Sequence, residues 1–230
     1  MTMLLLPTVV FTVMVVLNTM VNLSDDAVAV PIMDILIVLL MWILLSFPAV
    51  FAGATLSSRT NKLTFPTHTS SFAREIPPIP WYKGKLSAIL WGGLVSFSTF
   101  FVNFNAILDS VWYGQIYATF GFAMLVFLLV CTVTGVSTAA LVFQRFLSED
   151  HQWWWPAFSI GGASGGYMFL YSVYWFLGLE VSPDTPLMYG LYFGYMTLLS
   201  LAATVTFGSI GVLSSLWFNR MIYGKVEVNT

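Results

Sequence analysis

Apolar residues fill most of the chain in long runs that short polar segments separate. Six runs are long enough to cross a bilayer, at residues 4–21, 32–54, 86–108, 115–146, 154–177 and 187–218. A helix rises about 1.5 Å per residue, so about 20 apolar residues span the hydrocarbon core and satisfy every backbone amide within the segment. The pattern predicts an all-α polytopic membrane bundle of six spans, forming a single transmembrane domain over residues 1–230.

The first run also has the apolar character of a signal peptide. Residues 1–22 lack a basic start, however, and no small-x-small cleavage site leads into a soluble domain. We therefore expect this run to be retained as the first span.

Composition agrees with a chain whose main solvent is lipid. Of its residues, 58% are apolar and 8% are charged, whereas about a quarter are charged in an ordinary soluble domain. No basic cluster with interleaved aromatics occurs, so nucleic acid is not an expected partner. The single cysteine, Cys131, excludes an intrachain disulfide and a metal site built from several cysteines.

The cationic residues predict the orientation of the chain. All eight fall in alternate connections of the six-span arrangement or in the C-terminal tail: Arg59, Lys62, Arg74, Lys83, Lys85, Arg145, Arg220 and Lys225. The opposite connections carry only acids: Asp25, Asp26, Asp109, Glu180 and Asp184. Because short cytosolic loops are enriched in Lys and Arg, we expect both termini in the cytosol.

Two segments outside the spans are expected on the cytosolic side. The connector over residues 55–85 contains Arg74-Glu-Ile-Pro-Pro-Ile-Pro-Trp-Tyr82, in which the prolines favour a polyproline-like backbone. It is expected to skim the membrane as a rigid strap, or alternatively to bind a proline-recognising domain. Residues 219–230 are expected to form a short tail.

Small residues are the most informative feature inside the spans. The fifth run contains two overlapping GxxxG patterns in GGASGG, and the sixth run adds further glycines. These candidate positions are Gly161, Gly162, Gly165, Gly166, Gly190, Gly194, Gly208 and Gly211. Such spacing lets helix backbones approach closely. It indicates either packing within this bundle or a face that recognises the transmembrane helix of another protein.

Polar side chains within the spans leave a second function open. Asp34 lies near one end of the second run, and Asn103 and Asn105 lie in the third. Ionisable and amide groups at membrane depth mark transport routes in some proteins and join helices in others. The alternative to a helix-recognition function is therefore a channel or transporter subunit with a polar path near these three residues.

The segment Ser148-Glu-Asp-His-Gln-Trp-Trp-Trp155 places three residues that could take part in acid–base or metal chemistry, Glu149, Asp150 and His151, in succession. Three consecutive donors rarely converge on one ion, and no second cluster completes a shell. An acidic helix start followed by an interfacial tryptophan anchor explains the segment better. Nucleophile elbows, phosphate-binding loops and zinc-helix motifs are absent from the sequence. We therefore expect no enzyme activity, no metal and no cofactor.

An ordered set of motifs resembles a known family. Besides the proline-rich connector and the tryptophan loop, the chain contains Gly92-Gly93, Phe120-Gly-Phe122, Phe169-Leu-Tyr-Ser172, Tyr192-Phe-Gly-Tyr195 and Gly208-Ser-Ile-Gly211. Together these are similar to the C-terminal six-helix portion of the nonaspanins, the transmembrane 9 superfamily or EMP70 family. The likeness extends over essentially the whole chain.

The resemblance implies a trafficking protein of Golgi and endosomal membranes. Family members have a large lumenal domain and nine spans, and they are implicated in sorting other membrane proteins. By this likeness the chain corresponds to the last six spans, as a fragment, a truncated product or a short paralogue. The implied partners are the lipid bilayer and the transmembrane helices of cargo proteins.

Family tails commonly carry a signal for a coat protein. Here Lys225-Val-Glu227 has the composition of such a signal, but three residues follow it. Tyr223-Gly-Lys-Val226 resembles a tyrosine-based adaptor signal, although it comes directly after the last span. Tyr223, Lys225 and Glu227 are thus candidate contacts for coat or adaptor proteins, and the alternative is an inert tail.

Overall fold

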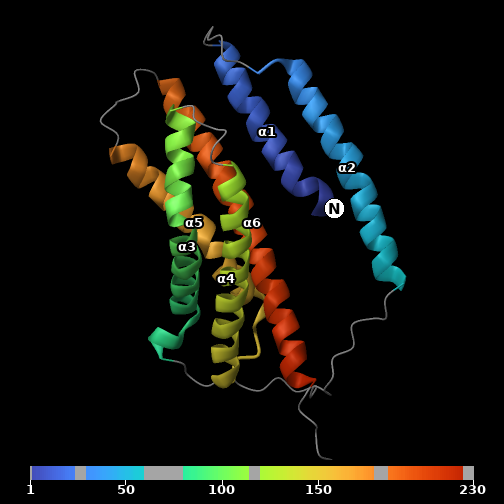
Figure 1. Ribbon diagram of the computed structural model, residues 1–230, viewed down its shortest axis with the longest axis vertical. Helices are drawn as coiled ribbons and strands as arrows, with labels where there is room; N and C mark the ends of the chain where they lie inside the picture. Colours follow the sequence, from blue (N-terminus) through green and yellow to red (C-terminus); the bar gives the residue numbers. More distant parts are fainter. Residues whose placement is uncertain (1, 24–29, 60–79, 114–119, 179–185, 225–230) are drawn as a thin grey trace, which may run out of the picture. The chain divides into compact units, whose positions relative to one another are not determined.

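A computed structural model of the chain describes residues 2–23, 30–59, 80–113, 120–178 and 186–224. These residues form the helices α1 Thr2–Leu23, α2 Ile32–Arg59, η1 Trp81–Lys83, α3 Lys85–Tyr113, α4 Phe120–Leu147, α5 Trp154–Gly178 and α6 Pro186–Tyr223 (Figure 1). Within the described ranges all regular structure is helical. The all-α prediction is confirmed.

Each of the six predicted apolar runs corresponds to one α-helix. Four helices in the described residues are long and apolar enough to cross a membrane, over Ile32–Arg59, Lys85–Leu108, Ala123–Leu147 and Leu187–Tyr223. The apolar part of α1, Pro7–Asn22, is shorter. In α5 the glycines, serines and tyrosines dilute the apolar side chains. That α1 and α5 also cross the membrane stays a prediction.

The helices divide into two compact units, and α6 contributes to both. The first unit contains α1, α2 and residues 186–198 of α6. The amide group of Asn18 accepts from the backbone N–H of Val30 at 2.9 Å and donates to its carbonyl at 3.1 Å. The rings of Phe11 and Trp42 meet edge to face with centroids 6.3 Å apart. The first contact joins α1 to the residue just before α2, and the second joins α1 to the middle of α2.

The second unit packs α3, α4, α5 and the rest of α6 around small and aliphatic side chains. Ala88, Val142, Ala157 and Ile160 form a buried cluster from α3, α4 and α5. Val126, Val130 and Phe207 form a second cluster between α4 and α6. Because lipid is as apolar as these residues, close packing and interhelical hydrogen bonds rather than water exclusion hold such helices together.

The second unit collects positive charge at one end. The Nζ of Lys85, the first residue of α3, donates to Oε1 of Gln152 in the α4–α5 loop at 3.3 Å. The end of α6 lies at the end of α4, where the rings of Tyr223 and Phe146 meet with centroids 6.4 Å apart. Lys85, Arg145 and the last-turn residue Arg220 therefore share one end of the unit. Which side of a membrane this end faces stays a prediction.

The predicted connector and tail are described only at their edges. Helix α2 continues through Arg59, and Pro80 has an extended conformation with φ −61° and ψ 148° before the turn of η1. The proline-rich segment before it lies outside the described residues. Helix α6 continues to Tyr223, so the first five residues expected in the tail, 219–223, are helical.

Candidate functional site

Three of the candidate glycines bring α5 into direct contact with the backbone of α6. A Cβ added at Gly162 would lie 3.0 Å from the carbonyl oxygen of Thr204. At Gly165 it would lie 2.6 Å from the carbonyl oxygen of Ser200, and at Gly161 it would meet the carbonyl oxygen of Phe207. Real Cβ atoms do not approach oxygens as closely as at Gly161 and Gly165, so only glycine fits at these two positions, and a Cβ at Gly162 would make a tight contact.

The glycines of α6 complete the same helix contact from the other side. A Cβ at Gly208 would lie 2.7 Å from the ring of Phe158, and one at Gly211 would lie 2.9 Å from the carbonyl oxygen of Ala157. Ser200 fastens the pair, because its Oγ donates to the carbonyl oxygen of Gly165 at 2.6 Å. Close backbone approach with an interhelical hydrogen bond is typical of small-residue packing in membranes.

The remaining candidate glycines have other surroundings. Gly166 and Gly190 are exposed, and a Cβ at either would meet no atom within 4 Å. Gly194 packs in the first unit, where a Cβ would lie 2.8 Å from the methyl groups of Leu17. The candidate set thus divides into glycines that hold helices of this chain together and two that leave an open helix face.

The polar residues proposed for a transport route lie in different environments. Asp34 is exposed in the first turn of α2 and belongs to the first unit. Asn103 is buried in α3, where both atoms of its amide group lack a hydrogen-bond partner among the described residues. The Oδ1 of Asn105 accepts from the hydroxyl of Tyr171 on α5 at 3.1 Å. The structure therefore joins Asn105 to a neighbouring helix and leaves Asn103 unsatisfied.

Of the three candidate contact residues in the tail, the structure describes Tyr223. It is the last residue of α6, is 42% exposed and contacts the ring of Phe146. Lys225 and Glu227 lie outside the described residues.

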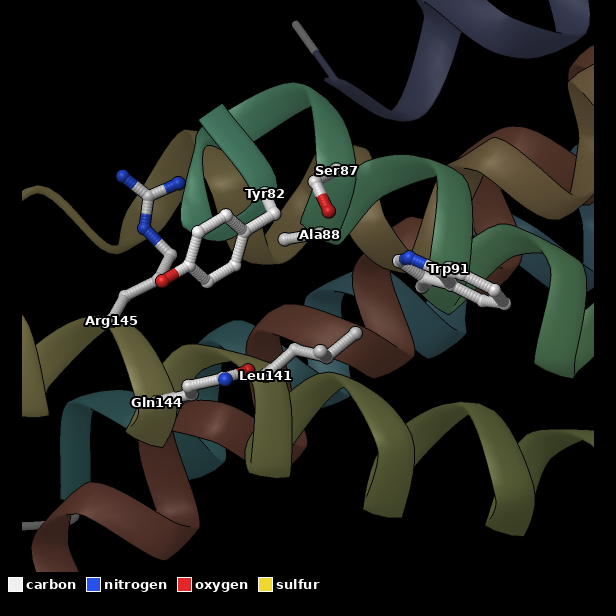
Figure 2. A pocket seen from close by; sticks show the side chains of 7 residues that line it. All are labelled: Tyr82, Ser87, Ala88, Trp91, Leu141, Gln144 and Arg145. Atoms are coloured by element: carbon white, nitrogen blue, oxygen red, sulfur yellow. The ribbon is translucent and has the colours of Figure 1, made fainter. Parts of the chain in front are cut away.

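A polar cavity of about 360 Å³ lies at the charged end of the second unit (Figure 2). Its lining comes from η1, α3 and α4: Tyr82, Ser87, Ala88, Trp91, Leu141, Gln144 and Arg145. In Figure 2, Arg145 and Tyr82 lie at one end of the cavity and Trp91 at the other. Arg145 is the only charged side chain among these lining residues.

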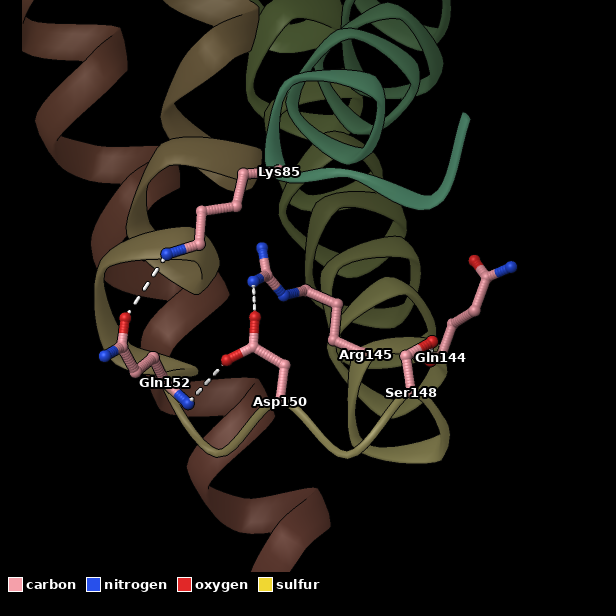
Figure 3. A network of polar contacts seen from close by, with 6 residues as sticks. All are labelled: Lys85, Gln144, Arg145, Ser148, Asp150 and Gln152. Atoms are coloured by element: carbon pink, nitrogen blue, oxygen red, sulfur yellow. Dashed lines mark hydrogen bonds and ion pairs between the residues drawn. The ribbon is translucent and has the colours of Figure 1, made fainter. Parts of the chain in front are cut away.

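Arg145 forms an ion pair with Asp150 across the end of α4 (Figure 3). The turn between them is a Schellman motif, in which the amide of Asp150 donates to the carbonyl of Arg145 at 3.2 Å and that of Glu149 to Phe146 at 3.0 Å. Glu149 occupies the left-handed position of the motif with φ 58°. This turn folds the loop back so that Asp150 points at Arg145, whereas Glu149 and His151 remain exposed.

Charge and hydrogen bonding stabilise the ionised form of Asp150. Burial alone would raise the pKa of this carboxyl. The amide of Gln152, which donates to its Oδ1 at 3.0 Å, and the charges of Arg145 and Lys85 outweigh burial and hold the pKa below its usual range. Asp150 is therefore a charged structural group that orients a buried guanidinium.

The sequence alone does not predict the ion pair: there Arg145 indicates only the orientation of the chain, and Asp150 is one of three consecutive candidate metal ligands. A cation in the last turn of a helix followed five residues later by an acid was the available signal. It becomes specific only when the Schellman turn reverses the chain direction.

Apolar helices of membrane-spanning length, small-residue helix contacts and a charged end define a polytopic helical membrane protein. Residues 1–182 match the family described as Endomembrane protein 70, and the chain belongs to this family. No solved structure matches the chain.

Curated relatives carry the name of the transmembrane 9 superfamily. Member 9 of Arabidopsis thaliana is 36% identical over 226 residues, which cover 98% of this chain and 35% of the relative. Member 4 of Rattus norvegicus is 31% identical over 226 residues, with coverage of 98% and 35%. Member 2 of Pongo abelii is 30% identical over 226 residues, with coverage of 98% and 34%. The chain thus spans about a third of the length of these relatives.

Proposed function

We propose that this chain acts in Golgi or endosomal membranes in the sorting and localisation of other membrane proteins, without catalysis. It would do so by recognising transmembrane helices of cargo proteins through a glycine-bearing helix face. Membership of the Endomembrane protein 70 family supports the compartment. The surroundings of the glycines support the mode of recognition.

The observation that carries the proposal is the open space beside Gly166. This residue belongs to the same GGASGG segment as the packed glycines, yet it faces away from them. Leu170 and Tyr174 follow at four-residue spacing on α5 and are 66% and 72% exposed. A glycine beside large apolar side chains leaves a shallow groove in the helix surface, and the backbone of a second helix can pack into it. Gly190 offers a similar open position on α6.

The inner glycines have a supporting role in this proposal. Gly161, Gly162 and Gly165 fix α5 against α6. The exposed strip on α5, formed by Gly166, Leu170 and Tyr174, therefore belongs to a rigid helix pair. Substituting them would disturb the scaffold before it tested recognition. A substitution at Gly166 alone separates the two roles.

The test compares Gly166→Leu with Ala140→Leu, which places the same leucine side chain at another exposed position, on α4. Each variant is expressed with a single-span reporter whose transmembrane helix is glycine-rich. Disulfide or photo-crosslinking in membranes measures contact, and microscopy measures the residence of the reporter in Golgi and endosomes. We expect Gly166→Leu to abolish the crosslink and relocate the reporter, and Ala140→Leu to change neither. An unchanged crosslink in a folded Gly166→Leu variant would refute helix recognition at this strip.

The C-terminal tail is proposed to connect recognition to transport through coat or adaptor proteins. Tyr223 supports this role by its exposure at the end of α6, and Lys225 and Glu227 supply the composition of a coat signal. Replacing Lys225 and Glu227 with alanine is expected to reduce coat binding and shift the steady-state compartment. The Tyr223→Ala variant separately tests the adaptor signal. Unchanged location in both variants would indicate an inert tail.

A channel or transporter subunit is the second candidate, favoured by the unsatisfied amide of Asn103. Other buried polar atoms without a partner among the described residues lie on α3, α4 and α6: Ser96 Oγ, Thr134 Oγ1, Thr138 Oγ1, Ser215 Oγ and the Asn219 amide. A hydrated route would satisfy such groups. In a Cys131→Ala background, modification of Asn103→Cys by a charged, water-soluble thiol reagent would support transport. Lack of modification would leave recognition as the function.

A further inference from the structure

The guanidinium of Arg145 has hydrogen-bonding capacity that the protein does not use. Its side chain is 5% exposed, and Nη2 donates to Asp150. Nε and Nη1 are buried and have no partner among the described residues. Buried donors are nearly always satisfied, and leaving a donor of a charged group buried without a partner is energetically costly. A hydrogen-bond acceptor bound in the cavity that Arg145 lines would satisfy these donors.

The chemistry of the cavity favours an anion. Arg145 is the only charged group among its lining residues, and Ser87, Tyr82 and Gln144 add neutral polar groups. Lys85 lies close enough to Asp150 for its charge to lower the pKa of that carboxyl. Phosphate is a usual hydrogen-bond partner of arginine, and a phosphate oxygen can accept from Nη1 of Arg145 while Nη2 stays paired with Asp150.

An apolar groove lies beside this cavity along α3. The groove has a volume of about 450 Å³ and is lined by Trp81, Leu86, Ser87, Leu90, Trp91, Leu94 and Tyr167. It shares Ser87 and Trp91 with the polar cavity. Its walls are open to the surroundings, with Leu86 74% and Trp91 62% exposed. The polar cavity thus has as its neighbour on α3 a groove that suits a hydrocarbon chain.

We propose that this joined site binds an anionic phospholipid of the surrounding bilayer. The phosphate would accept a hydrogen bond from Nη1 of Arg145, and an acyl chain would lie along α3 beside Leu90 and Leu94. Trp81, 87% exposed next to the cavity, belongs to the residue types that concentrate at the headgroup level. The groove distinguishes a phospholipid from free phosphate, because only the lipid fills both compartments. The site is independent of the proposed cargo strip on α5.

The test measures binding of phosphatidic acid to the purified full chain in detergent by native mass spectrometry. Phosphatidylcholine, diacylglycerol and inorganic phosphate at equal concentration are the comparison ligands. We expect phosphatidic acid to bind about tenfold more tightly than each of them, the difference that one charge-assisted contact supplies. Equal retention of diacylglycerol would overturn the role of the phosphate. Full displacement of phosphatidic acid by equal inorganic phosphate would overturn the role of the groove.

Two variants test the two compartments separately. Arg145→Gln with Asp150→Asn replaces the ion pair by a neutral pair of similar shape and is expected to weaken phosphatidic acid binding about tenfold. Arg220→Gln removes an exposed cation from α6 and serves as its control. Leu90→Trp fills the groove and is expected to weaken binding similarly, with Leu213→Trp on an exposed face of α6 as control.

Thermal unfolding identifies the variants that remain folded. Wild-type affinity in either folded test variant would overturn the proposal. If the double variant does not fold, the groove variant decides by itself, because it leaves the ion pair intact. Cargo crosslinking through Gly166 is measured in parallel, so that failure of lipid binding and failure of the proposed function are distinguished.

Discussion

Arg145, in the last turn of α4, and Asp150, in the loop that follows, form an ion pair whose side chains are only 5% and 2% exposed. The pair closes the Schellman turn and fixes the guanidinium at the polar cavity. Helix end, loop and cavity are thus connected through two side chains.

Asp150→Ala is expected to lower the free energy of unfolding by about 3 kcal/mol, because it leaves a buried guanidinium without its counter-ion. Thermal or denaturant unfolding in detergent measures the change. His151→Ala, at an exposed neighbour in the same loop, is the control and should stay within about 0.5 kcal/mol of wild type. Equal stability of the two variants would contradict a stabilising ion pair.

The lowered pKa of Asp150 predicts a loss of stability in acid. Because the folded state holds this pKa below its ordinary value of 3.8, its contribution is fully present above that value. It is lost as the pH falls through the lowered pKa, where protonation removes the charge on Asp150. Unfolding measured between neutral pH and pH of about 3 should show a smaller acid dependence in Asp150→Asn than in wild type. Parallel pH curves would count against this linkage.

Glu149 occupies a backbone conformation that glycine adopts more easily, with φ 58°. Comparison of Glu149→Gly with Glu149→Ala isolates the backbone effect, since both variants remove the same side-chain interactions. We expect the glycine variant to be more stable than the alanine variant by about 1 kcal/mol. Matched thermal unfolding curves measure the difference. A more stable alanine variant would show that the turn relaxes out of the left-handed region.

A larger side chain should reduce the stability of the protein at one of two neighbouring glycines in α5 and leave it nearly unchanged at the other. Gly165→Leu places side-chain atoms against the backbone of Ser200 and Thr204 and should destabilise the chain by about 2 kcal/mol or more. Gly166→Leu enters open space and should change stability by no more than about 0.5 kcal/mol. Unfolding in detergent compares the two. Similar losses in both variants would mean that the space beside Gly166 is filled by another part of the protein.

The candidate glycines show which part of the helix packing can be predicted from the sequence and which part cannot. The GxxxG spacing identifies small residues that bring helices together, but it repeats on adjacent faces of α5. The sequence does not say that Gly165 faces α6 and that Gly166 faces away, because that depends on the rotation of α5 against its neighbour. Asn103 and Asn105 show the same limit: both are amides in one apolar run, yet only Asn105 reaches Tyr171.

By itself, the sequence determined the helices, because backbone amides in a membrane must be satisfied within each segment and long apolar runs therefore become helices. It also determined the family, through an ordered set of motifs. Only the tertiary structure decided which glycines are covered, that Arg145 pairs with Asp150, and that a polar cavity and an apolar groove are neighbours on α3. These features depend on the rotation of each helix and the direction of each loop, which the packing of neighbouring side chains sets.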